Sequence, residues 1–423
     1  MLTAISGINW GDEGKGRMVD LLSENYDIVV RYQGGNNAGH TVVNEKGKFI
    51  LNLLPSGILR EKVVNVMGNG MVIDIKHLSE EIGRLQSAGI KITPENLKIS
   101  DRAVICMPYH VMQDVLEETR LKDKKYGSTR RGIAPVYGDK YLKKCIRMGD
   151  LKDIALAESR LADILEWKNL TIEKVYGSEP VKIEDMRNYL ETYGKPFLPF
   201  IIDTGKYLND AETAGKKIMF EAQLGALRDI DFGIYPFTSS SNTVAAYAPI
   251  GAGIPNRRLD LSIGIMKAYS SCVGEGPFTC EYFGDKAHEL REAGGEYGAA
   301  TGRPRRVGPF DVVASKYGIR VQGADEIALT KLDVLSGMKE IEVCVAYEKD
   351  GEVTTEFPYP QELDGYKPVF KTLKGWNCDI SSCRKKEELP KEALNYIKFI
   401  EEQTGAKIKY VSVGAEREEY IVF

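Results

Sequence analysis

Residues 2–24 read LTAISGINWGDEGKGRMVDLLSE, and this stretch decides the fold. An apolar run over residues 2–8 predicts a buried strand, and the apolar residues within 15–24 recur at helical spacing. Between them lies the glycine-rich loop 11–16. A loop that joins a strand to a helix can aim backbone N–H groups at a phosphate, with the positive end of the helix dipole behind them. The stretch therefore predicts a strand-loop-helix unit that could bind an anion.

The loop differs from the standard phosphate-binding loop. Gly7 is too far from Gly14-Lys15 for that spacing, and Gly16 stands where Ser or Thr would hold magnesium. The two acids of the loop would repel a phosphate unless one of them binds a metal ion or takes a proton. The hexapeptide by itself leaves two interpretations open, a phosphate-binding loop or a tight strand-to-helix turn.

A second glycine-rich loop, GGNNAGHT at residues 34–41, follows a strand expected at residues 27–32. It contains His40, one of four histidines in the chain. A lone histidine is more often structural, but an imidazole in such a loop can approach a ligand and act as an acid or hydrogen-bond donor near neutral pH. Because ligands bind α/β sheets at the carboxyl ends of strands, two such loops on neighbouring strands predict one shared crevice.

The rest of the chain alternates the same two patterns. Further strands are expected at residues 49–54, 63–67, 217–220, 261–268, 327–330, 342–347 and 409–413, and helices include 78–85 and 393–403. The turn 45–47 predicts a hairpin that ends in the strand 49–54. This alternation predicts an α/β fold with a large, mostly parallel central β-sheet flanked by helices, in a P-loop-NTPase-like layout. We interpret residues 1–423 as a single catalytic domain with helical insertions around 75–205.

Composition restricts the class of function. The chain has 423 residues, 43% hydrophobic and 28% charged, with a formal net charge of -4, so no nucleic-acid partner is expected. It has no run of eighteen apolar residues, and residues 1–16 lack a cationic leader pattern, so neither a membrane span nor a signal peptide is expected. The seven cysteines are scattered without a CxxC pair, which indicates reduced thiols in a cytoplasmic enzyme.

A series of motifs occurs in one order along the chain. They are WGDEGKG (10–16), RYQGGNNAGHT (31–41), LLPSGIL (53–59), GNG (68–70), STRRGIAP (128–135), YPFTSSSNT (235–243), GAATGRPRR (298–306), TKLDVL (330–335), GW (375–376) and ALNYIKFIEEQTG (393–405). In this order and spacing the chain resembles the adenylosuccinate synthetases over essentially its whole length. The combination of WGDEGKG with QGGNNAGHT is close to diagnostic of that family.

The resemblance implies a ligase that uses GTP to join L-aspartate to IMP, giving adenylosuccinate, GDP and phosphate on the route to AMP. The 6-oxygen of IMP attacks the γ-phosphate of GTP, and the aspartate amine then displaces phosphate from 6-phosphoryl-IMP. Asp12 matches the family's general base and a ligand of Mg²⁺, and the carbonyl of Gly39 matches a second contact to that ion. His40 matches the catalytic donor to the 6-oxygen. Lys15 would stabilise charge on the transferring phosphoryl group.

The resemblance also implies three sets of binding residues, although a Lys-x-Asp triplet or a basic loop alone is common. Asp333 would read the guanine, because an ionised carboxylate can accept from both N1–H and the 2-amino group. The residues expected to bind GTP are Gly11, Asp12, Glu13, Gly14, Lys15, Gly16, Gly39, His40, Thr41, Arg305, Lys331, Leu332, Asp333, Ser412, Val413 and Gly414. Those expected to bind IMP are Asp12, Lys15, Asn37, Ala38, Gly39, His40, Thr129, Lys143, Gln223, Leu224, Ser239 and Arg303. Those expected to bind aspartate are Ala299, Ala300, Thr301, Gly302, Arg303, Pro304 and Arg305, since guanidinium forks suit carboxylates.

Several positions differ from the family pattern, mainly around the monophosphate. The amide of Gln223 sits one residue early, and Leu224 occupies the matching position. Lys143 replaces an arginine that in this family reaches across a two-fold interface to IMP, which implies a homodimer with shared active sites. Further differences are Arg130 after Thr129, Ser239 in place of Thr, and Ala300 in place of Thr.

Two alternatives remain at this point. The chain could ligate aspartate to another purine monophosphate such as dGMP, but viral relatives that do so lack the loop aspartate, and the presence of Asp12 favours IMP. It could also be a guanine-nucleotide-binding protein without ligase turnover. In that case His40 and the Arg-rich loop at residues 298–306 would have no function. Aspartate-dependent release of phosphate from GTP would distinguish an enzyme from such a protein.

Overall fold

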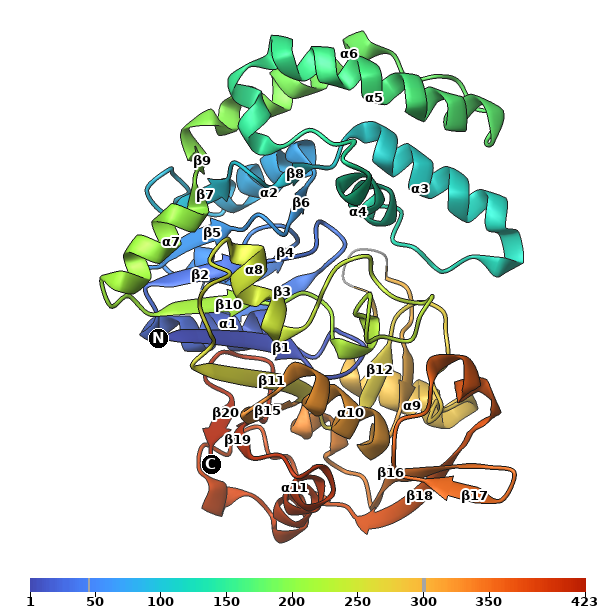
Figure 1. Cartoon of the computed structure of the whole chain (residues 1–423). Coiled ribbons are helices and arrows are strands. Elements are labelled where there is room, and N and C mark those ends of the chain that lie inside the picture. Colours follow the sequence, from blue (N-terminus) through green and yellow to red (C-terminus); the bar gives the residue numbers. More distant parts are fainter. Residues whose placement is uncertain (45, 299–301) are drawn as a thin grey trace.

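A ten-stranded β-sheet forms the centre of the computed structural model, which describes residues 1–44, 46–298 and 302–423 (Figure 1). The strand order is β20-β19-β15-β11-β1-β10-β2-β5-β7-β9, and the pairings are parallel except for that of β19 with β20. The mostly parallel sheet predicted from the sequence is therefore confirmed. Its strands are β1 (Leu2–Gly7), β2 (Ile28–Arg31), β5 (Val64–Met67), β7 (Leu97–Ser100), β9 (Ile201–Ile202), β10 (Ile218–Glu221), β11 (Leu261–Lys267), β15 (Glu326–Thr330), β19 (Ile408–Ser412) and β20 (Tyr420–Val422).

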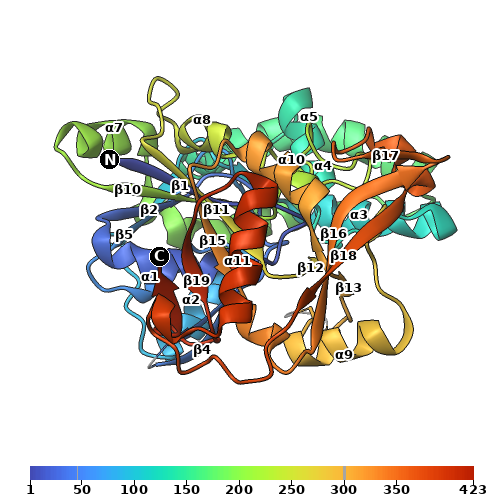
Figure 2. The same ribbon diagram turned by 90° about the horizontal axis from the view of Figure 1, so that it is seen from below.

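Helices flank the sheet and extend beyond one of its edges (Figure 1). They are α1 (Lys15–Leu22), α2 (Ile75–Ser87), α3 (Pro108–Leu121), α4 (Ile133–Leu142), α5 (Ile154–Lys174), α6 (Ile183–Tyr189), α7 (Thr204–Thr213), α8 (Ala248–Ala252), α9 (Gly284–Gly294), α10 (Val312–Gln322) and α11 (Lys391–Thr404). Figure 2 shows α11 running alongside β19 and β15, where the buried face of this helix joins the apolar core around those strands. Among the described residues, no helix is both long enough and apolar enough to cross a bilayer.

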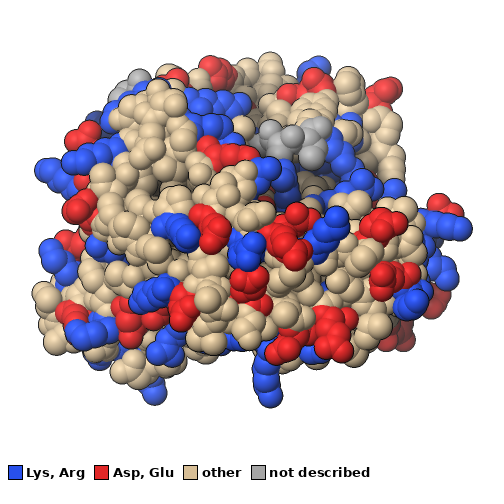
Figure 3. All heavy atoms as spheres, turned by 90° about the horizontal axis from the view of Figure 1, so that it is seen from above, with Lys and Arg blue, Asp and Glu red and all other residues tan. Residues whose placement is uncertain are grey.

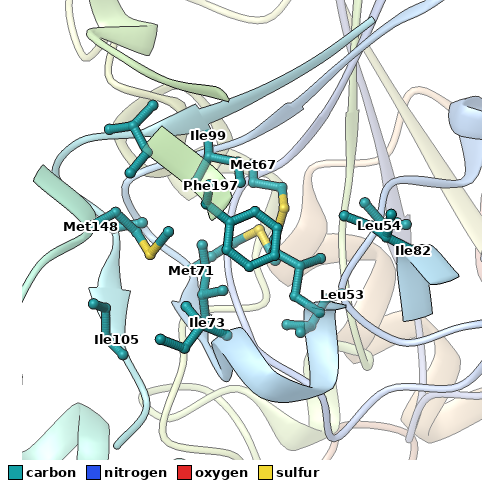
Figure 4. Close-up of a cluster of buried hydrophobic side chains, with 14 of the residues drawn as sticks. Leu53, Leu54, Met67, Met71, Ile73, Ile82, Ile99, Ile105, Met148 and Phe197 are labelled. Carbon is teal, nitrogen blue, oxygen red and sulfur yellow. The ribbon is translucent and has the colours of Figure 1, made fainter. Parts of the chain in front are cut away.

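The segment 75–205 supplies most of the helical layer, which forms the upper part of Figure 1. It also supplies β7 and β9, which complete one edge of the main sheet. Figure 4 shows that side chains of this segment, such as Ile105 and Phe197, pack with Met67 of β5 in one buried cluster. The helical layer therefore shares an apolar core with the sheet. On its outer face, basic and acidic side chains are interspersed (Figure 3).

The remaining strands form small sheets outside the central one. The predicted strand at 342–347 exists, but it lies in a separate four-stranded sheet, because β16 pairs with β14 and β17 along one side and with β18 along the other. The strands of the small sheets are β3 (His40–Asn44), β4 (Gly47–Leu51), β6 (Val72–Ile73), β8 (Val104–Ile105), β12 (Ser270–Cys272), β13 (Arg306–Gly308), β14 (Phe310–Asp311), β16 (Glu340–Lys349), β17 (Glu352–Thr354) and β18 (Lys367–Lys374). The predicted hairpin is confirmed as β3 and β4, with His40 opposite Leu51.

The order of the central strands corrects one expectation about the two glycine-rich loops. These loops follow β1 and β2, which we expected to be neighbours, but β10 lies between them and pairs with both. The three strands are parallel, so their carboxyl ends meet at one edge of the sheet. A third segment, which begins at Glu221 where β10 ends, therefore lies between the two loops.

Candidate functional site

A cavity of about 1290 Å³ lies at this edge, between the main sheet and the helical layer. Both glycine-rich loops line it, together with α3 and α4, the segment 235–240 and the turn after β15. The predicted site residues in its lining are Gly11, Asp12, Glu13, Gly14, Lys15, Gly16, Asn37, Ala38, Gly39, His40, Thr41, Thr129, Leu224, Ser239, Arg305, Lys331, Asp333 and Gly414. The predicted residues that are described but lie outside the lining are Lys143, Gln223, Gly302, Arg303, Pro304, Leu332, Ser412 and Val413. Most of the predicted site residues that the structure describes therefore line one continuous cavity.

In the first loop, the two acids have different surroundings. The side chain of Asp12 is 34% exposed to the cavity, and its backbone is left-handed with φ 59°. Glu13 is buried, accepts the N–H of Gly11 at 2.8 Å, and forms an ion pair with Lys15 at 2.6 Å. Glu13 therefore holds the loop and balances the lysine, so Asp12 is the acid of this loop whose carboxylate is available to a ligand. This arrangement explains how a loop with two acids can face an anion.

In the second loop, His40 is held by a carboxylate from the strand that intervenes. Its Nδ1 lies 2.5 Å from Oε1 of Glu221, and Glu221 also accepts the N–H and hydroxyl of Ser56 at 2.7 and 2.6 Å. Glu221 is fully buried, whereas His40 is 8% exposed and lines the cavity. Because the carboxylate takes Nδ1, the other ring nitrogen, Nε2, is left for a ligand.

Burial is the largest influence on this pair. Burial of the imidazole lowers the pKa of His40, and the hydrogen bond to Glu221 opposes that shift without cancelling it. Burial pushes the pKa of Glu221 upward, but its bonds to His40 and the charge of Arg31 outweigh burial and leave this pKa below its ordinary value. Both pKa shifts favour an ionised Glu221 beside a neutral His40 near pH 7. An anion arriving near Nε2 would favour the charged imidazolium.

The two loops touch directly. A Cβ built on Gly16 would lie 2.6 Å from the Cβ of His40, closer than real side chains approach. Glycine is required at this position because the beginning of α1 packs against the beginning of β3. The convergence of the two loops on one cavity, predicted from the sequence, is therefore confirmed.

The segment that begins at Glu221 places the side chain of Gln223 beneath the cavity. Gln223 is buried, with its Oε1 accepting from Arg31 at 2.6 Å and its Nε2 donating to Asn37. Leu224 has a left-handed φ of 64° and lines the cavity. Because the glutamine sits one residue early in the sequence, the amide of Gln223 supports Asn37 from below the cavity. The side chain at the next position, Leu224, faces the cavity instead.

The turn after β15 carries Asp333, whose carboxylate can accept hydrogen bonds from a ligand. Oδ1 of Asp333 is buried and finds no donor within the described parts of the chain, and burial raises the pKa of Asp333. A buried acceptor without a partner is costly and is explained most simply by a ligand that supplies the donor. Lys331 lies beside it and donates to the carbonyl of Gly294.

Arg17 was not identified from the sequence, although it organises this end of the cavity. Its guanidinium donates to the hydroxyl of Ser412 and to the carbonyls of Gly414, Glu416 and Glu419, the last at 3.0 Å. One planar fork thereby ties α1, which follows the first loop, to the segment after β19. An arginine in an amphipathic helix carries no local signal of such a role, because its partners lie about 400 positions away (395 to 402).

The Arg-rich loop approaches the first loop through one of its arginines. Nε of Arg305 lies 3.1 Å from Oδ2 of Asp12, and its Nη1 lies 2.8 Å from Glu296. Arg303 is exposed, outside the cavity lining, and 3.3 Å from Glu275. The predicted aspartate contacts at 299–301 lie outside the described residues.

Two carboxylates of α3 hold the segment that carries Thr129. Asp114 accepts the hydroxyl of Ser128 at 2.6 Å and the N–H of Gly132 at 2.8 Å. Glu118 accepts two further backbone N–H groups of the same segment, from residues 126 and 127. Lys143 lies at the exposed end of α4 with a left-handed φ of 63°, outside the cavity of its own chain.

Among the described residues, the cavity contains no preformed cluster of metal-ligating side chains. Within the described ranges, no group of three or more His, Cys, Asp or Glu side chains is placed to hold one. The Asp12 carboxylate and the Gly39 carbonyl, both in the lining, are oxygen donors of the kind that Mg²⁺ prefers. Because Mg²⁺ is usually held by one or two carboxylates together with substrate phosphates, these residues fit a metal that arrives with a nucleotide.

Comparisons with known proteins agree with the resemblance seen in the sequence. A family model described as adenylosuccinate synthetase matches residues 4–421. Relatives named adenylosuccinate synthetase include that of Carboxydothermus hydrogenoformans, 47% identical over 418 residues, covering 98% of this chain and 97% of the relative. That of Lactococcus lactis subsp. lactis is 45% identical over 417 residues, covering 98% and 96%.

Two solved structures are also similar. The fully ligated adenylosuccinate synthetase from Plasmodium falciparum matches with a TM-score of 0.93 at 38% identity, covering 100% of this chain and 99% of the other. A cyanophage S-2L succinoaminodeoxyadenylate synthetase bound to dGMP and dATP matches with a TM-score of 0.60 at 18% identity, covering 100% and 95%. The second likeness shows the fold alone.

Proposed function

This chain belongs to the adenylosuccinate synthetase family, and on that premise we propose how its residues carry out the GTP-dependent ligation of L-aspartate to IMP. The products are adenylosuccinate, GDP and phosphate. Ligation to dGMP is not favoured, because the relative bound to dGMP is only 18% identical, whereas the synthetases named above reach 38–47%. A binding protein without turnover is not favoured either, since the matched relatives are synthetases over nearly their whole length.

The observation that carries the proposed mechanism is that Asp12 and His40 line one cavity from loops that touch. Asp12 takes the N1 proton of IMP, which makes the 6-oxygen a nucleophile. As the anionic phosphates bind, His40 takes up a proton from solvent at Nε2 and donates it in a hydrogen bond to the 6-oxygen, and Glu221 balances the charge of that imidazolium. Lys15 and the N–H groups of the first loop stabilise the negative charge on the phosphoryl group.

The binding residues are proposed on the same grounds. Asp333 accepts the N1–H and 2-amino donors of guanine, while Arg305 and the segment around it receive the carboxylates of the substrate aspartate. IMP would lie between the second loop, Thr129 and Ser239. Asp12 and the carbonyl of Gly39 would hold Mg²⁺, which, when bound, neutralises charge on the phosphates of GTP. If one oxygen of Asp12 takes the N1 proton of IMP and the other contacts the metal, Arg305 must leave its position 3.1 Å from Oδ2.

We also propose a homodimer in the cytoplasm. The position of Lys143 outside its own cavity suits a residue that reaches the IMP site of a partner. Sedimentation with and without IMP tests the dimer. In the same preparation, Lys143→Ala should raise KM for IMP and leave KM for GTP unchanged. If the wild-type protein stays monomeric at saturating IMP, a shared site does not exist.

Asp12→Ala tests the proposed general base, with adenylosuccinate formation from IMP as the assay. Comparing IMP, GMP and dGMP as substrates of the wild-type enzyme tests the choice of nucleotide. A missing general base typically costs a factor of about 10²–10⁴ in rate, so the variant should lose at least that much kcat while its thermal unfolding stays unchanged. Near-normal turnover would remove the general-base role. A strong preference of the wild-type enzyme for either guanylate would overturn the choice of IMP.

A further inference from the structure

A buried carboxylate behind the cavity gathers three cations. Glu296 is fully buried, and its Oε1 lies 2.7 Å from Nζ of Lys267 and 3.4 Å from Nζ of Lys331. Its Oε2 lies 2.8 Å from Nη1 of Arg305. Tyr269 donates a further hydrogen bond to the same side chain. Nothing in the mechanism above uses Glu296.

The cations come from separate elements of the fold. Lys267 ends β11, Lys331 follows β15, and Arg305 precedes β13. The N–H of Arg305 also donates to the carbonyl of Glu296 at 2.9 Å, so these two residues face each other at the base of the Arg-rich loop. A bridge between Tyr297 and Pro304 continues that pairing. Glu296 therefore anchors the loop by its backbone and side chain together.

The charges at this cluster favour an ionised Glu296. Burial acts to raise its pKa, but the charges of Lys267, Lys331 and Arg305 outweigh burial and hold the pKa far below the ordinary value. Two of these three cations, Lys331 and Arg305, reach the cavity, whereas Lys267 does not line it. Arg305 continues to Asp12 at 3.1 Å. A chain of charges thus runs from Lys331 through Glu296 and Arg305 to Asp12.

We propose that Glu296 is a positioning residue that fixes Arg305 for the substrate aspartate and Lys331 for the guanine nucleotide, so that one carboxylate sets the geometry of two binding sites. The proposal rests on the site assignments made above. The competing explanation is structural: Glu296 would serve only as the counter-charge of the buried Lys267. The two differ in what happens when Lys267 and Glu296 lose their charges together.

In Glu296→Gln, Lys331 and Arg305 lose the charge that fixes their positions, and Arg305 keeps only its existing contact with Asp12. Replacing a charged hydrogen-bond partner costs about 1.5–3 kcal/mol, which corresponds to about 10- to 150-fold in a binding constant. KM for aspartate and KM for GTP should therefore each rise about tenfold or more, with KM for IMP within about twofold of wild type. The single variant also leaves Lys267 buried without a counter-charge, so it is destabilised for a separate reason.

The double variant Lys267→Met/Glu296→Gln separates the two explanations and keeps the test available if the single variant does not fold. With both charges removed, Lys267 no longer leaves a buried positive charge without a counter-charge, so thermal stability should recover toward wild type. Under our proposal KM for aspartate and GTP stays raised, because Arg305 and Lys331 remain unanchored. If both KM values return to wild type in the double variant, Glu296 is only a counter-charge and the proposal is overturned.

Two further variants complete the experiment. Glu281→Gln is the matched control, because Glu281 pairs with Arg306 at 2.8 Å beside the same loop without contacting Arg305, and its KM values should stay near wild type. Arg305→Leu tests the site assignment separately. If it leaves KM for aspartate unchanged, the assignment of that site fails; if it raises KM while the double variant does not, only the inference about Glu296 fails.

Discussion

Glu221→Gln tests the contact that holds the histidine of the second loop. The carboxylate receives three hydrogen bonds, from Nδ1 of His40 at 2.5 Å and from the N–H and hydroxyl of Ser56 at 2.7 and 2.6 Å. Glutamine has nearly the same shape, but it keeps one acceptor oxygen and carries no charge. The imidazolium proposed to form during phosphoryl transfer would then be buried without its counter-charge.

The expected magnitude follows from that loss. A hydrogen bond to a charged group contributes about 1.5–3 kcal/mol, and each 1.4 kcal/mol is about tenfold in rate, so kcat should fall about 10- to 150-fold. The pKa of His40 is already lowered by burial, and Glu221 is the group that opposes this. Removing the carboxylate lowers it further, so the pH at which the variant is most active should move downward.

The assay is adenylosuccinate formation at saturating substrates across pH 5.5–9. Ser56→Ala is the control, because it removes one hydroxyl donor and keeps the Glu221 charge, and its kcat should fall less than that of the glutamine variant. Thermal unfolding of both proteins shows whether the fold is intact. If Glu221→Gln keeps kcat within about twofold of wild type across the range, or loses no more than Ser56→Ala, His40 does not depend on that carboxylate.

Three further outcomes are expected. Asp333→Asn should raise KM for GTP about tenfold or more and reduce the selectivity for GTP over ITP, because an amide cannot accept both guanine donors; unchanged selectivity in competition assays would refute this. Arg17→Lys cannot reproduce the planar guanidinium contacts that hold Ser412 and Gly414, two residues expected to bind GTP. KM for GTP should therefore rise several-fold, while kcat at saturating GTP and KM for IMP stay near wild type. Equal losses for GTP and IMP would indicate a general disturbance of the structure instead. Burial lowers the pKa of His40, His77 and His110, so the folded state binds fewer protons than the unfolded chain, and stability present above about pH 6.5 should be lost as the pH falls below it. Urea unfolding at pH 7.5 and 5.5 measures this, and an equal free energy of unfolding at both values would contradict it.

Local patterns in the sequence predicted much of the fold. The strand-loop-helix unit over residues 2–24, the hairpin after the second loop and the mostly parallel sheet are all present. Each depends on a period of apolar residues or on glycines at a turn, and such signals act over a few positions. Both glycine-rich loops were recognised for the same reason, since each is continuous in sequence.

The order of strands and the partners of the site residues were decided only in three dimensions. The sequence did not reveal that β10 lies between β1 and β2, so the carboxylate opposite His40, 181 positions away, was missed. Glu296 and Arg17 were missed likewise, because ordinary charged residues acquire these roles only through distant partners. No local pattern indicated that the side chain of Glu13 pairs with Lys15 of the same loop. The sequence determined which segments could bind phosphate and purine. Packing at the carboxyl edge of the sheet decided which charged side chains pair with each other, because that pairing depends on strand order and not on local pattern.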